Sequence, residues 1–232
     1  MELNKIYNMD CLIGMKDIPD KSIDLIVTDP PYRVISGGKP HLKGQPSGML
    51  SKNDGKIFKH NDINIEKWIP ELYRILKDNS QCYIMVNTIN LENYLTVCRN
   101  AGFKLHNVLM WHKNNATPSR WYMKNGEFVL FLRKGKAKKI NNVGSKMVHD
   151  FNNIIGNKKH PTEKPIELIK FYIENSSNEN DTILDPFMGS GTTAIACINT
   201  NRNYIGFELD KEYCDIANER IYEIVVEGGL QR

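Results

Sequence analysis

Apolar residues fall into two kinds of pattern along the chain, short β-branched runs and longer stretches with helical spacing. The segment Ile23-Asp-Leu-Ile-Val27 is apolar except at one position, which is typical of a strand buried in a parallel sheet. Residues 65–76 instead place Trp68, Leu72 and Ile75 on one face of a helix. The same patterns predict further strands at 5–10, 81–87, 103–111, 127–133 and 203–207, a strand ending at Leu184, and helices at 11–18, 91–101, 160–175, 192–199 and 213–224. This alternation predicts an α/β fold with a doubly wound, mostly parallel sheet.

Length and composition predict a single domain with an ordinary core. The chain has 232 residues, of which 41% are hydrophobic. No apolar run has the length of a membrane span and the first residues do not resemble a signal peptide, so a cytoplasmic protein is expected. The five cysteines are scattered and form no C-x-x-C pair, which favours a reducing compartment and gives no sign of a metal site.

Positive charge gathers in two segments. Residues 33–62 carry a net charge of +4 and residues 111–146 one of +8, whereas the whole chain carries only +4, so the remainder is acidic. This distribution is expected of a face that binds a polyanion, although two solvated loops would also produce it. Residues 33–62 are rich in glycine and proline, and so long a connection without a pattern is commonly functional or disordered.

A glycine-rich turn follows the strand that ends at Leu184. Gly189 and Gly191 predict a tight turn into the helix at 192–199, which is the strand-turn-helix arrangement of a nucleotide site. The turn also fits the dinucleotide fingerprint G-x-G-x-x-(G/A), but only about 40 residues follow it, too few for the second half of a dehydrogenase fold. Asp185-Pro186-Phe187 places a carboxylate and a ring before the turn, which suits the α-ammonium and adenine of S-adenosylmethionine better than a pyrophosphate.

A second polar motif follows the strand at 23–27. Asp29-Pro30-Pro31-Tyr32 lies where this strand should end, and its prolines alone would explain it as a rigid turn. In open α/β sheets, ligands bind at the carboxyl ends of the strands, near the point where the strand order reverses. We therefore expect Asp29 and Asp185 to lie at one site, although 156 positions separate them.

Together the two motifs resemble those of the amino-group DNA methyltransferases of the β order, in which the catalytic motif precedes the cofactor motif. The resemblance rests on residues 29–32 and 185–193 and extends to 160–165 and 204–210, so it covers nearly the whole chain. It implies the Rossmann-like fold of methyltransferases that use S-adenosylmethionine. It also implies one domain over residues 1–232, with the cofactor-binding portion at 160–232.

The resemblance implies how the acceptor is held. Asp29 and the backbone carbonyl of Pro30 would accept the N–H groups of a target amino group, while Tyr32 would stack on a base swung out of the duplex. Asp at the first position of the tetrapeptide, where many cytosine enzymes have Ser, favours N6 of adenine over N4 of cytosine, which is the alternative. A protein-glutamine methyltransferase has the opposite motif order, and a non-catalytic DNA-binding protein is disfavoured because neither motif is degraded.

The resemblance also implies how the cofactor is held. Glu208 would accept the ribose hydroxyls, and Asp10 with the Cys11 amide would lie beside the adenine, although Asp10 also fits a helix N-cap. Thr162 and Lys164 would meet the methionine carboxylate, although Thr162 also fits an N-cap. The predicted catalytic residues are Asp29, Pro30, Pro31 and Tyr32, and the predicted cofactor-binding residues are Asp10, Cys11, Asp29, Thr162, Lys164, Asp185, Pro186, Phe187, Gly189, Ser190, Gly191, Thr192, Thr193 and Glu208.

Double-stranded DNA is the expected partner, with residues 33–62 as a mobile loop over the target base and 112–146 as the target-recognition segment. Asn and Arg pair with base edges, and Lys neutralises phosphate. The candidates for DNA contact are Lys39, Lys43, Asn114, Arg120, Lys136, Lys138 and Lys139, together with Asn115 and Lys134. Trp121 and Tyr122 fit either core packing or a wedge between bases. A homodimer and a cognate restriction endonuclease are further expectations.

Overall fold

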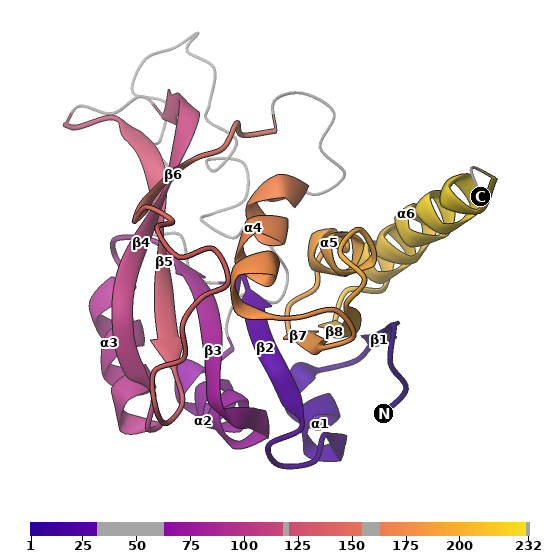
Figure 1. Ribbon diagram of the computed structural model, residues 1–232, viewed down its shortest axis with the longest axis horizontal. Helices are drawn as coiled ribbons and strands as arrows, with labels where there is room; N and C mark the ends of the chain where they lie inside the picture. The colour runs from indigo at the N-terminus through magenta and orange to yellow at the C-terminus, as the bar shows by residue number, and fades with distance from the viewer. Residues whose placement is uncertain (32–62, 118–120, 155–162, 231–232) are drawn as a thin grey trace, which may run out of the picture. The chain divides into compact units, whose positions relative to one another are not determined.

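The computed structural model of the protein describes residues 1–31, 63–117, 121–154 and 163–230 (Figure 1). The chain divides into two units, one formed by Met1–Pro30 with Ile65–Arg232 and the other by Pro31–Asn64. Several predicted features lie outside the described residues, namely the loop at 33–62 and the residues Tyr32, Lys39, Lys43, Arg120 and Thr162.

Within the described residues, an eight-stranded sheet forms the centre of the larger unit (Figure 1). Its strands are β1 (Lys5–Asn8), β2 (Ile23–Thr28), β3 (Leu76–Val86), β4 (Lys104–Thr117), β5 (Lys124–Arg133), β6 (Val148–Asp150), β7 (Thr182–Asp185) and β8 (Asn203–Glu208). Their order is β1-β8-β7-β2-β3-β5-β4-β6. Strand β5 runs antiparallel to β3 and β4, and the other neighbouring pairs are parallel, so the predicted mostly parallel sheet is confirmed.

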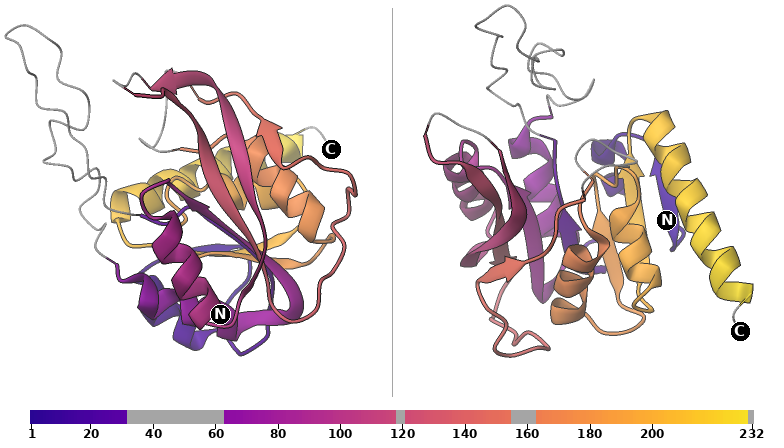
Figure 2. Two further views of the ribbon diagram at one scale, coloured as in Figure 1. Left: turned by 90° about the vertical axis from the view of Figure 1, so that its left-hand side faces the viewer. Right: turned by 90° about the horizontal axis from the view of Figure 1, so that it is seen from above.

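Helices cover both faces of this sheet (Figure 2). They are α1 (Cys11–Gly14), which continues as a 3-10 turn at Met15–Asp17, and α2 (Ile65–Ile75), α3 (Leu91–Asn100), α4 (Ile166–Ser176), α5 (Thr192–Ile198) and α6 (Lys211–Leu230). On one face α1 contacts α2 and α2 contacts α3, and on the other α4 contacts α5 and α5 contacts α6. The fold is therefore the doubly wound α/β arrangement that the sequence predicts.

The strand order places a topological switch between β2 and β7. The chain winds from β7 through α5 to β8 in one direction and from β2 through α2 to β3 in the other. Helices that follow these two strands consequently lie on opposite faces, and the carboxyl ends of β2 and β7 are left side by side. The apolar runs of both strands are buried, as Leu25, Ile26, Ile183 and Leu184 are each fully enclosed.

Several element boundaries differ from those predicted. Helix α2 ends at Ile75 and β3 begins at once, because Leu76 already pairs with Ile23 and a bulge separates this pair from the one that Gln81 makes with Leu25. Strands β4 and β5 extend through polar residues into a long hairpin, which an apolar pattern does not reveal. Helix α4 begins at Ile166 with Pro165 as its N-cap, so the prediction that Thr162 caps it is wrong. None of the described helices is long and apolar enough to cross a membrane.

Candidate active site

The carboxyl ends of β2 and β7 bring the two sequence motifs to one edge of the sheet. Leu25 pairs with Ile183 and Ile26 with Leu184, so Asp29 follows β2 at the level where Asp185 ends β7. The hydroxyl of Thr28 donates a hydrogen bond to Oδ1 of Asp185 over 2.8 Å. Parallel pairing thus joins the two motifs across 156 positions of sequence.

Asp185 is buried and organises the glycine-rich turn. Its Oδ1 also accepts the backbone N–H of Phe187 at 3.0 Å, and its Oδ2 accepts the hydroxyl of Thr193 at 2.6 Å. Burial raises the pKa of this carboxyl to about 6, against the opposing effect of the donors from Thr193, Thr28 and Phe187. A carboxylate offers about four acceptor positions, so these three bonds leave one for a ligand such as an ammonium group.

The turn after Asp185 has the backbone conformation for which glycine is suited. Gly189 and Gly191 have φ of 54° and 86°, in the left-handed region. A Cβ on Gly191 would also lie 3.0 Å from the Cβ of Ala217 in α6. The predicted tight turn at these glycines is confirmed, and Thr192 and Thr193 begin α5 directly after it.

Helix α6 holds the turn from behind through Arg220. Its guanidinium donates to the carbonyl oxygen of Ser190 at 2.6 Å and to the hydroxyl of Ser190 at 3.0 Å. The same guanidinium lies 2.7 Å from Glu163, whose side chain is buried just before α4. Sequence reasoning missed this clamp, because Arg220 belongs to no motif and only the chain fold brings α6 to the turn.

Glu208 lies at the same edge, at the carboxyl end of β8. Its Oε2 accepts the backbone N–H of Gly189 at 2.8 Å, and its Oε1 accepts that of Asp210 at 2.8 Å. Burial raises the pKa of this carboxyl above its ordinary value, although the backbone donors oppose the shift. The carboxylate is therefore fixed next to the glycine-rich turn, where its remaining acceptor positions can bind hydroxyl groups.

Strand β1 brings Asp10 and Cys11 beside Glu208. Asn8 at the end of β1 pairs with Glu208, and Asp10 follows it. Oδ1 of Asp10 accepts the backbone N–H of Leu12 at 2.8 Å, which confirms its predicted role as the N-cap of α1. Cys11 is buried, and burial raises the pKa of its thiol to about 12, so the thiol itself stays protonated at neutral pH.

The residues around Asp29 are largely buried. Pro30 is buried and Pro31 half-buried, and the ring of Phe187 packs edge-on against Trp68 of α2 at a centroid distance of 5.0 Å. The side chain of Asp29 is 22% exposed, but its Oδ1 atom is buried. Burial raises the pKa of Asp29, and the ammonium of Lys164 opposes this shift.

Lys164 lies against Asp29. Its Nζ is 2.5 Å from Oδ2 of Asp29 and 3.4 Å from Oε2 of Glu127, and Lys113 binds the other oxygen of Glu127. The sequence assigned Lys164 to the carboxylate of the cofactor, and that assignment stays a prediction. Glu127 and Lys113 were missed, since strand pairing rather than a motif brings them here. No group of three or more metal-ligating side chains occurs among the described residues.

The candidate DNA contacts divide between two edges of the sheet. Asn114 and Asn115 lie on the part of β4 that extends past the carboxyl end of β3, and both are exposed. Their side-chain oxygens accept hydrogen bonds from Asn153. The predicted contacts after β5 lie at the opposite edge, because β5 is antiparallel to β3: Phe128 pairs with Val86 at the carboxyl end of β3, and Arg133 at the end of β5 pairs with Gln81, further back along β3. These residues, which the structure does not bring near Asp29, are Lys136, Lys138 and Lys139.

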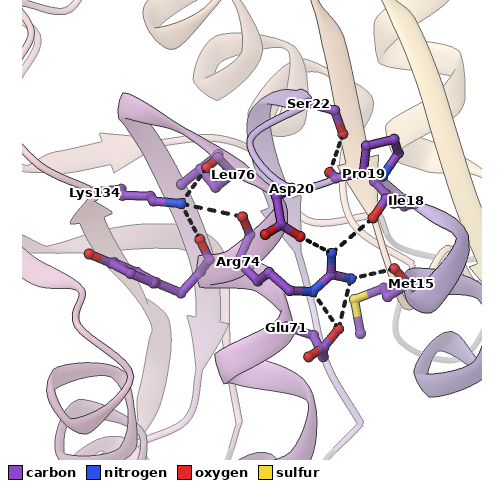
Figure 3. A network of polar contacts seen from close by, with 10 residues as sticks. Met15, Ile18, Pro19, Asp20, Ser22, Glu71, Arg74, Leu76 and Lys134 are labelled. Atoms are coloured by element: carbon purple, nitrogen blue, oxygen red, sulfur yellow. Dashed lines mark hydrogen bonds and ion pairs between the residues drawn. The ribbon is translucent and has the colours of Figure 1, made fainter.

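Lys134 is a structural residue and not a DNA contact, which corrects the sequence prediction (Figure 3). It is 5% exposed, and its Nζ donates to the carbonyl oxygens of Tyr73 at 2.6 Å and Leu76 at 2.7 Å. The ammonium therefore binds carbonyl groups where α2 ends and β3 begins, and the last carbonyl groups of a helix have no partner inside it. The basic run in the sequence concealed this role.

Replacing Lys134 with methionine should destabilise the protein without changing its affinity for DNA. The substitution leaves the carbonyl groups of Tyr73 and Leu76 without donors, at a cost of about 1–3 kcal/mol. Thermal unfolding should show a Tm lower by about 2–4 °C for each kcal/mol. Lys136→Met, at an exposed position nearby, is the control and should leave the Tm unchanged. A DNA affinity that falls with Lys134→Met at an unchanged Tm would contradict the structural role.

Comparisons with known proteins show the family of the chain. The profile of the DNA methylase family (N6_N4_Mtase) matches residues 23–219. The type II methyltransferase M2.MboI of Moraxella bovis is 33% identical over 243 residues, covering 94% of this chain and 88% of that protein. M.HinfI of Haemophilus influenzae is 32% identical over 250 residues, covering 96% and 69%.

Solved structures show the same fold. The crystal structure of the M1.HpyAVI–SAM complex is 29% identical and covers 93% of this chain and 98% of its own, with a TM-score of 0.70. The cytosine-N4-specific PvuII DNA methyltransferase is 19% identical with a TM-score of 0.72 over 93% and 85%, which supports the fold alone. The family profile spans both motifs that meet at the β2–β7 edge, and the predicted resemblance is confirmed: the chain belongs to the DNA methylase family of amino-group methyltransferases.

Proposed function

We propose that the protein transfers a methyl group from S-adenosylmethionine to the N6 amino group of adenine within a specific sequence of double-stranded DNA. The observation that carries the proposal is the meeting of Asp29 and Asp185 at the switch between β2 and β7, where a methyl donor and an acceptor amine can share one site. Membership of the DNA methylase family and relatives that are type II methyltransferases support it. Aspartate at the first position of the tetrapeptide favours adenine over the alternative, N4 of cytosine.

The residues on the β7 and β8 side fit the cofactor. Asp185 keeps one acceptor position for an α-ammonium group, and Glu208 is fixed by backbone donors where it can accept ribose hydroxyls. The turn at Gly189 and Gly191 has the positive φ that glycine adopts without strain, and Gly191 lets α6 pack closely behind it. The bound cofactor supplies a methyl group on a sulfonium, whose sulfur leaves as a neutral thioether.

Asp29 and Pro30 hold the acceptor. An exocyclic amine is a poor nucleophile because its lone pair is delocalised into the base. Oδ1 of Asp29 and the carbonyl oxygen of Pro30 accept its two N–H groups and favour a pyramidal nitrogen whose lone pair points at the methyl carbon. Transfer would form the new N–C bond as the C–S bond of the cofactor breaks, and the nitrogen, then cationic, would release one proton to solvent. Positioning of this kind supplies much of the acceleration, and it requires the base to leave the duplex.

Duplex DNA approaches, in this proposal, at the edge that carries Asp29. Pairing of β4 with β5 continues from Trp111 and Glu127 to Thr117 and Lys124, past the last pair of β3, so the hairpin extends beyond this edge (Figure 1). At its tip Trp121 is 87% and Tyr122 is 96% exposed, which removes the interpretation of these two rings as core. The described part of this hairpin, residues 112–117 and 121–126, falls within the predicted target-recognition segment and is our proposed DNA contact.

Tyr122→Ala should raise the KM for DNA about tenfold while the Tm stays unchanged, because stacking of a base on an aromatic ring contributes roughly 1–3 kcal/mol. Steady-state methylation at fixed S-adenosylmethionine measures this KM. Tyr222→Ala, which removes a 70% exposed ring from α6, is the matched control and should change neither value. Equal KM values for both variants would exclude the hairpin tip from the DNA contact.

Nucleoside analysis tests the proposed reaction. The protein is incubated with S-adenosylmethionine and unmethylated duplex DNA, the DNA is digested to nucleosides, and the methylated base is identified by mass spectrometry. We expect N6-methyladenine. N4-methylcytosine would overturn the choice of base while leaving the roles of Asp29 and Asp185 intact. If neither adenine nor cytosine is methylated, the proposal is contradicted. A homodimer and a cognate endonuclease stay predictions.

A further inference from the structure

Four charged side chains form a continuous chain of contacts beside the acceptor site. They come from β4 (Lys113), β5 (Glu127), the segment before α4 (Lys164) and the end of β2 (Asp29). Lys113 binds Oε1 of Glu127, Oε2 of Glu127 lies 3.4 Å from Nζ of Lys164, and this Nζ lies 2.5 Å from Oδ2 of Asp29. We call these residues the acceptor network.

The acceptor network is buried and alternates in charge. The side chains of Lys113, Glu127 and Lys164 are 18%, 22% and 9% exposed. Two ammonium groups face two carboxylates, so the charges balance. Charges taken out of water are costly unless they are paired. Burial would raise the pKa of Glu127, but Lys164 and Lys113 outweigh it and lower this pKa to about 2, so Glu127 is ionised throughout the working range.

The two oxygens of Asp29 have different surroundings. Oδ2 is bound by Lys164, whereas Oδ1 is buried and has no hydrogen-bond partner among the described residues. A buried carboxylate oxygen without a partner is rare, because it loses its hydration without compensation. A ligand that brings an N–H donor would satisfy it. The difference between the two oxygens depends on Lys164 staying at Oδ2.

The charge of Glu127 favours the position of the Lys164 ammonium at Oδ2 of Asp29. An ammonium beside a single carboxylate can bridge both of its oxygens, and in that position it would block Oδ1. Glu127 places a second negative charge 3.4 Å from this Nζ, as an ion pair without a hydrogen bond, and Lys113 fixes Glu127 in turn. Strand pairing fixes Glu127, since it faces Trp111 across β4 and β5, and Lys113 follows two residues after Trp111 on β4.

We infer that Glu127, held by Lys113, is a positioning residue that keeps the Lys164 ammonium on Oδ2 of Asp29 and so leaves Oδ1 open to the amino group of the target base. This inference rests on the proposed function. Lys164 is in this account also a positioning residue, because it acts on the acceptor through Asp29.

A purely structural network would stabilise the sheet edge without tuning Asp29, so the pH dependence of Asp29 separates the two roles. The groups that bear on Asp29 are Lys164, Glu127, Lys113, Asp185 and Tyr94. Burial raises the pKa of Asp29, Lys164 lowers it and Glu127 raises it. Glu127→Gln should therefore lower this pKa and Lys164→Gln should raise it, so the two variants shift in opposite directions.

The first measurement is single-turnover methyl transfer across pH for the wild type and for Glu127→Gln, Lys164→Gln and Lys164→Arg. We expect Glu127→Gln to slow transfer roughly 10- to 100-fold, as a small misplacement of a reacting group does, and to move the acidic limb to lower pH. Lys164→Gln should move the limb to higher pH, and Lys164→Arg should restore its position. Lys77→Met, which removes the partner of Asp24 at the other end of β2, is the matched control and should leave rate and limb unchanged.

A second measurement is independent of catalysis. Carbon-13 NMR follows the titration of the Asp29 carboxyl, assigned by its loss in Asp29→Asn, in the wild type and the two glutamine variants. Shifts of the Asp29 pKa in opposite directions in the two variants would support the inference even if the wild type methylates no DNA. The absence of methylation would overturn only the proposed function. Unmoved titrations would overturn the inference. So would a Lys164→Gln variant that raises the KM for S-adenosylmethionine at an unchanged transfer rate, because Lys164 would then serve the cofactor.

Discussion

Asp29→Ala should lower the rate of methyl transfer about 10²–10³-fold, the usual loss when a preorganised hydrogen-bonding group is removed from a reacting centre. Asp29 provides the buried Oδ1 that we assign to the amino group, whereas we assign the cofactor to Asp185 and Glu208 on β7 and β8. The affinity for S-adenosylmethionine should therefore stay within a few-fold of the wild type. Single-turnover transfer and calorimetric binding of the cofactor measure the two quantities separately.

Two further variants make this prediction sharper. Alanine removes the carboxylate partner of Lys164 at this position, so Asp29→Asn is included, because its amide oxygen can still accept from Lys164 while its amide nitrogen no longer accepts an N–H. Asp24→Asn is the control, since Asp24 lies at the opposite end of the same strand and is bound by Lys77. Unchanged transfer by Asp29→Ala would remove Asp29 from the mechanism.

Asp185→Ala should abolish measurable cofactor binding and lower the Tm. The substitution leaves the hydroxyls of Thr28 and Thr193 and the backbone N–H of Phe187 without their acceptor. Each unsatisfied buried group costs about 1–3 kcal/mol, and each kcal/mol lowers the Tm of a domain of this size by about 2–4 °C. Loss of these three bonds also releases the turn that carries Gly189. Thermal unfolding and calorimetry with S-adenosylmethionine measure both effects.

The pH dependence of cofactor binding tests the charge of Asp185 apart from its packing. Its pKa in the folded protein is about 6, so the apo protein protonates it below that pH. An α-ammonium binds the ionised form, and the Kd for S-adenosylmethionine should rise as the pH falls below about 6, towards tenfold per pH unit. Asp185→Asn keeps the shape and should give a weaker affinity that is flat across this range. An equal pH dependence in wild type and Asp185→Asn would show that Asp185 is not the group responsible.

The stability of the apo protein should depend on pH in the opposite direction to cofactor binding, so it should fall as the pH rises. The unfolded chain has the ordinary aspartate pKa of about 4, below the folded value of about 6. The part of the stability that comes from protonation of Asp185 is therefore fully present below pH 4 and is lost as the pH rises through 6. Asp185→Asn removes this contribution, so the difference between the two proteins should change over that range.

The sequence revealed those parts of the site that belong to contiguous motifs. Asp29 with its prolines and Asp185 with its glycines could be recognised because each motif has a local structural role. The prolines end a strand, and the glycines allow the positive φ of a tight turn. The rule that ligands collect at the carboxyl ends of strands was enough to bring the two together. Strand order β7-β2 provides the contact that this rule requires.

The sequence concealed what depends on pairing between distant segments. Glu127 and Lys113 reach the acceptor site because β5 is antiparallel to β4 and their register sets Glu127 opposite Trp111. Arg220 reaches Ser190 because α6 packs behind α5. Lys134 looked like part of a basic DNA-binding run, yet its ammonium is buried at the end of α2. A run of like charges does not show which of its members face solvent. Without the direction of β5, the sequence also does not show whether the residues that follow this strand lie at the edge of the sheet that carries Asp29 or at the opposite edge.

The most direct test of the account is a crystal structure of the protein with sinefungin, an analogue of the cofactor, and a duplex that carries its mapped recognition sequence. The account predicts an adenine turned out of the duplex, with its N6 within hydrogen-bond distance of Oδ1 of Asp29 and of the carbonyl oxygen of Pro30, and Lys164 still on Oδ2. A flipped cytosine in this place, or a target base whose amino group makes no contact with Asp29, would contradict it.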